Sequence, residues 1–83
     1  MNLHEMIDVI KERILNEVLE APDRKIDEKT PLISSGLIDS FHLVDVSIFV
    51  EEVFGVKIED YELNADTFDT TEELAKLIQE RLK

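Results

Sequence analysis

The 83-residue chain contains no cysteine and no tryptophan, and it has only two glycines and two prolines. Without cysteine, the chain cannot form a disulfide or a thiolate metal site, and it cannot supply a thiol nucleophile. Two separate glycines, Gly36 and Gly55, exclude a glycine-rich phosphate-binding loop. No apolar run approaches the ~20 residues of a membrane helix, and no signal-peptide pattern follows Met1. We therefore expect a soluble, cytoplasmic protein that packing alone stabilises.

Basic residues are also scarce, because nine lysines and arginines face twenty acidic residues and give a net charge of −11. This balance argues against binding to a nucleic acid backbone or to an anionic membrane surface, and it favours basic protein partners. The chain is 43% hydrophobic, which is too apolar for a disordered acidic tail. Its length predicts a single domain over residues 1–83.

The first segment predicts an amphipathic helix from Leu3 to about Ala21. Asn2 and Glu5 form a variant of the capping box at its start, and Pro22 disfavours helical geometry in the residue before it. Apolar residues recur at helical spacing on one face, namely Leu3, Met6, Ile7, Ile10, Ile14 and Val18.

Residues 22–39 predict a long ordered loop, because they contain both prolines, two adjacent serines and a glycine without any sustained period. Loops of this length are usually functional or disordered. Five apolar residues should hold this one against the core: Ile26, Leu32, Ile33, Leu37 and Ile38.

The second helix should span residues 40–54, with Asp39 as its N-cap and Gly55 as the left-handed residue that ends it. At 100° per residue it carries two apolar stripes. One should face the core, and comprises Leu43, Val46, Val50, Val53 and Phe54. The other points well away from the first and comprises Phe41, Val44 and Ile48.

After this helix, residues 56–58 predict a linker, and a short helical turn is expected over residues 60–65 with Tyr61 and Leu63 turned inward. A last helix follows, because Thr70 and Glu73 form a capping box and apolar residues repeat with helical period, namely Leu74, Leu77, Ile78 and Leu82. Phe68 can act as its hydrophobic staple. The predicted fold is all-α: a small four-helix bundle of three main helices and one short helix, with a long loop between helices 1 and 2.

Catalysis by the chain itself finds little support. A serine nucleophile needs a nearby base, but His42 follows Ser40 by two residues and should point away from it on a helix. His4 is expected at another polar helix position. We expect neither catalytic residues nor a metal site, although four acidic residues could attract a divalent ion weakly: Asp60, Glu62, Asp66 and Asp69.

Ser40 itself can be interpreted in two ways. It is either an ordinary helix start or an exposed hydroxyl at the positive end of a helix dipole, where an attached anionic group would be stabilised. Composition and periodicity do not separate these alternatives.

The tripeptide Asp39-Ser40-Phe41 in this context resembles the carrier-protein family, whose members carry 4′-phosphopantetheine on a serine that opens helix 2. The likeness covers nearly the whole chain. The chain agrees with the family in its length, its acidity, its long first loop and the Gly-Val-x-Ile stretch after Phe54. The resemblance implies attachment at Ser40 by a phosphopantetheinyl transferase that uses coenzyme A, with Asp39 as motif residue and cap.

The resemblance also implies that helix 2 recognises partner enzymes. Six residues match the docking positions: Phe41, Val44, Asp45, Ile48, Glu51 and Glu52. The partners would be the transferase, an acyl- or aminoacyl-loading ligase, and downstream transferases or synthases with basic patches. The alternative is an unmodified acidic helical adaptor that binds a basic protein through the same helix. For the carrier we expect a monomer; the second stripe could otherwise be an oligomer seam or be covered by the loop.

Two features bear on the carried intermediate. The run Gly36-Leu37-Ile38 departs from the pattern of housekeeping fatty-acid carriers and is closer to D-alanyl, aminoacyl or specialised acyl carriers. Ser47 is expected on the core side of helix 2, bonded to the Leu43 carbonyl, with Phe49 near the edge of that face. Ser47 and Phe49 together could reshape an internal pocket for the cargo.

Overall fold

The computed structural model describes residues 2–21 and 23–82, so Met1, Lys83 and Pro22, which was expected to end the first helix, lie outside the described residues. Three α-helices form the frame: α1 (Leu3–Arg13), α2 (Ser40–Phe54) and α3 (Thr71–Arg81). Two short elements accompany them: the π-helical η1 (Ile14–Val18), which continues α1, and the 3-10 helix η2 (Asp60–Glu62). Within the described ranges there is no strand, and the all-α prediction is confirmed.

The first helix begins as predicted but ends differently. The Asn2 Oδ1 atom accepts from the Glu5 N–H at 2.9 Å, and the Glu5 carboxylate accepts from the Asn2 N–H at 3.4 Å. The α-helical pattern stops at Arg13, and η1 follows with wider turns. Glu20 then adopts a left-handed backbone with φ 51°, a conformation that glycine usually takes at a helix end. The left-handed residue at this helix end is therefore a glutamate.

The second helix has the predicted bounds, with Asp39 as N-cap and Gly55 at φ 71° as C-cap. Two details of its inner face correct the sequence prediction. Phe49 is buried rather than at the edge. Ser47 is only partly buried, and its hydroxyl donates to the Val44 carbonyl at 2.7 Å instead of the Leu43 carbonyl.

The predicted short helix over residues 60–65 is reduced to the single 3-10 turn of η2. Tyr61 was expected to point inward, but its side chain is 79% exposed, because η2 directs it to solvent. Leu63 does pack against the core as predicted.

The start of α3 confirms half of the predicted capping box. The Thr70 Oγ1 atom accepts from the Glu73 N–H at 3.0 Å, but the Glu73 carboxylate accepts from the Asp69 N–H at 2.7 Å and not from Thr70. Leu82, which the periodicity placed with the apolar stripe, lies beyond the helix end and is 53% exposed.

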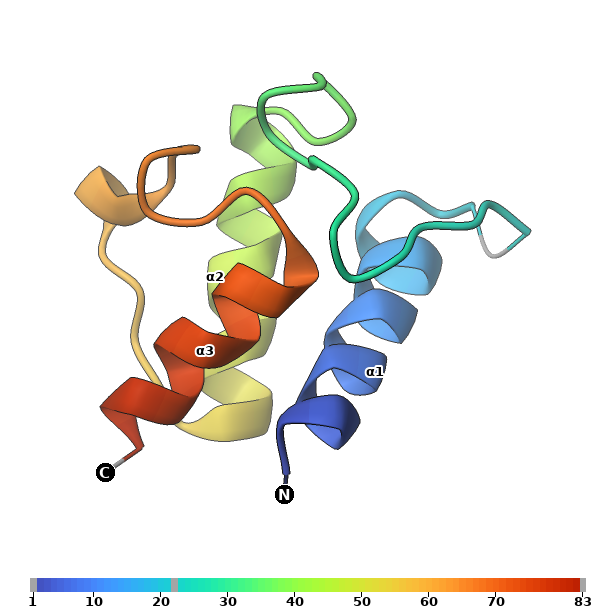
Figure 1. The fold of residues 1–83 in the computed structure, drawn as a ribbon. Helices are drawn as coiled ribbons and strands as arrows, with labels where there is room; N and C mark the ends of the chain where they lie inside the picture. The colour runs from blue at the N-terminus through green and yellow to red at the C-terminus, as the bar shows by residue number, and fades with distance from the viewer. Residues whose placement is uncertain (1, 22, 83) are drawn as a thin grey trace.

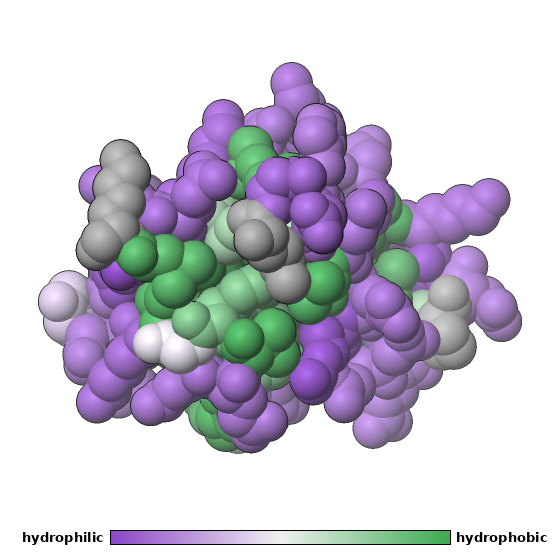
Figure 2. All heavy atoms as spheres, turned by 90° about the horizontal axis from the view of Figure 1, so that it is seen from below, coloured by the Kyte–Doolittle hydropathy of each residue, from purple (hydrophilic) through white to green (hydrophobic). Residues whose placement is uncertain are grey.

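The buried apolar side chains form one cluster between the helices, with α1 packed against α3 and η1 against α2. Helix α1 begins and α3 ends at one end of the molecule, whereas α2 begins at the opposite end (Figure 1). Seen from below, an apolar area lies in the middle of that first end, surrounded by polar side chains (Figure 2). No helix in the described part of the chain is both long and apolar enough to cross a bilayer.

Candidate functional site

Ser40 is the first residue of α2, where the long loop passes into the helix (Figure 1). Its side chain is exposed. Among residues 2–21 and 23–82, no side-chain hydrogen bond involves its hydroxyl group. The hydroxyl is therefore available to an enzyme that approaches this end of the molecule.

Asp39 supplies the cap that Ser40 would otherwise have to provide. Its Oδ1 atom accepts from the backbone N–H groups of Phe41 and His42, both at 3.0 Å. The hydrogen bond from His42 is the main cause that lowers the pKa of Asp39, so the carboxylate remains ionised at neutral pH. The capping role predicted for Asp39 is confirmed, and the Ser40 side chain does not cap the helix.

His42 takes a role in this cap that the sequence prediction missed. Its Nδ1 atom accepts from the Asp39 N–H at 3.2 Å and completes a reciprocal capping box. Glutamate or glutamine usually fills this position. The signal was present as a hydrogen-bond acceptor three residues after the cap, but His42 was expected only at a polar helix position and away from Ser40. Its engaged nitrogen now also argues against a role as a catalytic base.

Asp69, just before α3, holds the loop that leads to Ser40. Its Oδ1 atom accepts from the N–H groups of Ile33 at 2.7 Å and Ser34 at 2.9 Å, and its Oδ2 atom accepts from the Ser34 hydroxyl at 2.5 Å. Its carbonyl also accepts from the Leu32 N–H at 2.6 Å. Partial burial acts to raise the pKa of Asp69, but these hydrogen bonds outweigh it and lower the pKa.

Apolar anchors hold the same loop from the inside. Ile26, Leu32 and Ile38 are buried, and Ile33 and Leu37 pack against the core, as the sequence predicted. Gly36 makes the turn between them at φ 80°, and its N–H donates to the Ile33 carbonyl at 3.0 Å. The loop is thus an ordered support for the start of α2.

The second apolar stripe of α2 lies on the surface, as predicted. Phe41 is 82% exposed, Val44 49% and Ile48 50%. The carboxylates of the same face, Asp45, Glu51 and Glu52, are exposed as well. This combination of apolar and acidic side chains starts directly beside Ser40. Its part in partner recognition stays a prediction.

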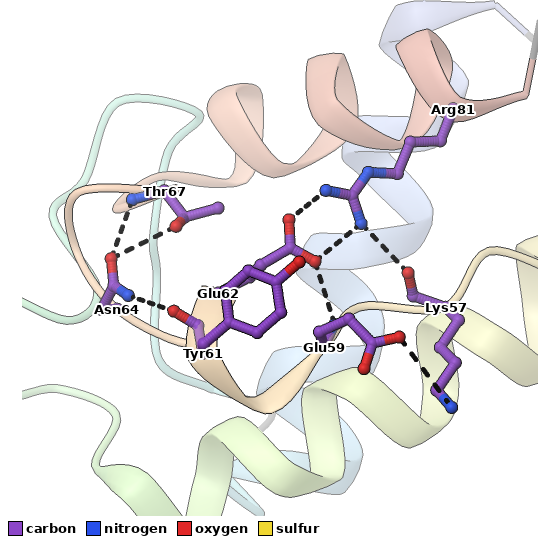
Figure 3. Close-up of polar contacts among 7 residues, drawn as sticks. All are labelled: Lys57, Glu59, Tyr61, Glu62, Asn64, Thr67 and Arg81. Carbon is purple, nitrogen blue, oxygen red and sulfur yellow. Dashed lines mark hydrogen bonds and ion pairs between the residues drawn. The ribbon is translucent and has the colours of Figure 1, made fainter.

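A polar cluster holds η2 against the end of α3 (Figure 3). The Arg81 guanidinium forms an ion pair with Glu62 and also donates to the Lys57 carbonyl at 3.1 Å. The hydrogen bond from Arg81 lowers the pKa of Glu62, and the same bond raises the pKa of Arg81. The Tyr61 side chain, drawn with this cluster in Figure 3, stays largely exposed to solvent.

The acidic residues considered for a weak ion site do not converge. Glu62 is paired with Arg81, and Asp69 is occupied by the loop. In the part of the chain that the structure describes, no group of three histidine or acidic side chains could hold a metal ion.

Comparison with known proteins adds an independent result. No curated protein and no solved structure matches the chain. A protein-family model described as "Phosphopantetheine attachment site" matches residues 12–78, a span that includes Ser40 and the whole of α2. Domains of this family are the attachment site for the 4′-phosphopantetheine prosthetic group. Because the match spans more than half of the chain, the protein belongs to the phosphopantetheine attachment-site family of carrier domains.

Proposed function

We propose that Ser40 is the attachment residue and that the chain carries thioester-bound acyl or aminoacyl intermediates between biosynthetic enzymes. The hydrogen bonding of the four serine hydroxyls carries this proposal. The hydroxyl of Ser34 donates to Asp69, that of Ser35 to the Pro31 carbonyl, and that of Ser47 to the Val44 carbonyl. In the described residues, Ser40 is the one serine whose hydroxyl has no such acceptor.

Attachment requires the Ser40 oxygen to form a bond to phosphorus, while the pyrophosphate bond of coenzyme A breaks and the nucleotide part leaves. The hydroxyl proton must pass to a base. The Nδ1 atom of His42 is engaged with Asp39, so the transferase has to supply that base. Once attached, the group supplies a thiol that holds the cargo as a thioester.

The exposed face of α2 supports docking of successive enzymes beside this serine. Its apolar side chains offer area to bury, and its carboxylates favour basic partners such as the transferase, a loading ligase and downstream synthases. Surface charge pairs are screened over about 8–10 Å at physiological salt. Partner affinity should therefore weaken as the salt concentration rises.

Intact mass spectrometry tests the attachment. Incubation with coenzyme A, magnesium and a broad-specificity phosphopantetheinyl transferase should add one phosphopantetheinyl group to the wild type and none to Ser40→Ala. The matched control Ser47→Ala should be modified like the wild type. An adduct that persists in Ser40→Ala would refute the proposal.

The 82% exposure of Phe41 also fits a second candidate, an unmodified adaptor that binds a basic partner through α2. The two functions differ in what Ser40→Ala does. Partner binding by an adaptor survives Ser40→Ala and is lost in Ile48→Arg, whereas the carrier function is lost in both variants. Pull-down of partner enzymes combined with a thioester-loading assay separates them.

A further inference from the structure

A surface groove of about 450 Å³ lies between the two halves of the long loop, close in sequence to Ser40. Its size falls within the range of about 300–1,000 Å³ that is typical of small-molecule sites. Its lining includes Arg24, Lys25, Thr30, Ser35, Gly36 and Leu37.

The charge of this lining is opposite to that of the molecule. Acidic residues outnumber basic ones by twenty to nine in the chain, yet the groove is lined by Arg24 and Lys25 and by no carboxylate. Both cations are exposed, and neither forms an ion pair with any residue in the described ranges. Ile26, Pro31 and Leu37 supply apolar walls beside them.

The groove is held in shape by the contacts of the loop itself. On one side, the Asp27 carboxylate accepts from the Lys29 N–H at 2.7 Å and the Thr30 hydroxyl at 3.1 Å. On the other side, the Ser35 hydroxyl donates to the Pro31 carbonyl at 2.6 Å. Such preorganisation reduces the cost of binding a ligand.

The groove also lies within reach of an arm on Ser40. Three peptide units separate Leu37 from Ser40, so their Cα atoms are at most about 11 Å apart. A phosphopantetheine arm is longer than this. Tethering gives the end of the arm an effective concentration in the millimolar range at such distances.

We propose that the groove binds the free carboxylate of a dicarboxylic acyl cargo carried on Ser40, with Arg24 and Lys25 as its counter-ions and Leu37 against the acyl chain. This inference rests on the proposed function, because the cargo reaches the groove through the arm. It narrows the cargo class from any acyl or aminoacyl group to one with an anionic end.

The test compares two cargoes that differ in charge. A broad-specificity transferase loads the chain from succinyl-coenzyme A or butyryl-coenzyme A, and intact mass confirms each product. In 1H–15N spectra at low salt, the amides of Arg24, Lys25, Ser35 and Gly36 should shift at least twofold more with the succinyl than with the butyryl cargo. Substituting both cations, Arg24→Gln with Lys25→Gln, should remove that difference, whereas Lys76→Gln on α3 should leave it intact.

The outcomes distinguish this inference from the proposed function. Equal shifts for the two cargoes overturn the groove site but leave attachment at Ser40 standing. Shifts that appear only with an added enzyme would assign the groove to an acidic protein segment and also overturn the proposal. If no cargo is loaded, the proposed function fails, and titration with free succinyl-pantetheine then tests whether the groove binds the anion. Amide shifts in the wild type that disappear in Arg24→Gln with Lys25→Gln support the groove site. If the wild type shows no such shifts, the groove site is overturned.

Discussion

Helices α2 and α3 begin with the same local arrangement, an N-cap residue followed by a hydroxyl residue, yet the two hydroxyl groups have opposite environments. Asp39 caps α2 and Ser40 follows, exposed to solvent. Thr70 caps α3 and Thr71 follows, with no exposed surface. The Thr71 hydroxyl is buried and has no hydrogen-bond partner among the described residues. A helix-start hydroxyl is therefore a site for chemistry only where the surrounding fold leaves it accessible.

Removing the carboxylate that ties α3 to the loop should have the largest effect on stability. Asp69→Ala leaves the N–H groups of Ile33 and Ser34 without their acceptor, and we expect the free energy of unfolding to fall by about 2 kcal/mol. Chemical denaturation measures this loss. Asp66→Ala, an exposed control nearby, should stay within about 0.5 kcal/mol of wild type, and an equal loss in both variants would contradict the role of Asp69.

Replacing the buried Thr71 hydroxyl should have the opposite effect and raise the free energy of unfolding. Thr71→Val keeps the shape of the side chain but removes a buried polar group without a partner, which we expect to add about 1 kcal/mol of stability. For a domain of this size, that raises Tm by roughly 4–8 °C. Thermal unfolding followed by circular dichroism measures the shift, and a lower Tm would show that the hydroxyl has a stabilising partner in solution.

The exposed cap should matter less for stability than Asp69. Asp39→Ala removes the acceptor for the first N–H groups of α2, and Tm should fall, but by less than in Asp69→Ala. Asp39→Ser restores a capping oxygen and should recover most of the loss. If Asp39→Ala lowers Tm more than Asp69→Ala does, the expected order of the two carboxylates is wrong.

The last and smallest expected effect is the contribution of Asp69 to acid sensitivity. Its pKa is lowered in the folded state, so its stabilising contribution is present above the ordinary value of 3.8 and is lost as pH falls through the folded-state pKa. Between pH 5 and 3, wild type should therefore lose more unfolding free energy than Asp69→Asn. Parallel pH dependences would contradict the assigned cause.

The sequence predicted the helix that presents the serine better than the contacts that support it. The bounds of α2, its Asp39 cap and its exposed Phe41 stripe follow from local periodicity and capping, which depend on residues only three or four positions apart. The hydrogen bond from the Ser34 N–H to the Asp69 carboxylate joins residues 35 positions apart, and no local pattern encodes it.

The remaining errors have the same origin. Tyr61 was expected inside because a helical turn over residues 60–65 would carry it inward. The segment forms only the 3-10 turn η2, which the Arg81–Glu62 ion pair holds, and the Tyr61 side chain is exposed. His42 was expected at a polar helix position and not as a base for Ser40, but its hydrogen bond with the Asp39 backbone N–H was not foreseen.

The central claim is that Ser40 is selected among the four serines because its hydroxyl is exposed and donates to no acceptor in the described residues. Tandem mass spectrometry of the modified protein tests this claim most directly. After the transferase reaction, the digest should show the phosphopantetheinyl group on the peptide fragment that contains Ser40, with Ser34, Ser35, Ser47 and Thr71 unmodified. An adduct located on any of those four residues, while Ser40 stays unmodified, would contradict the account.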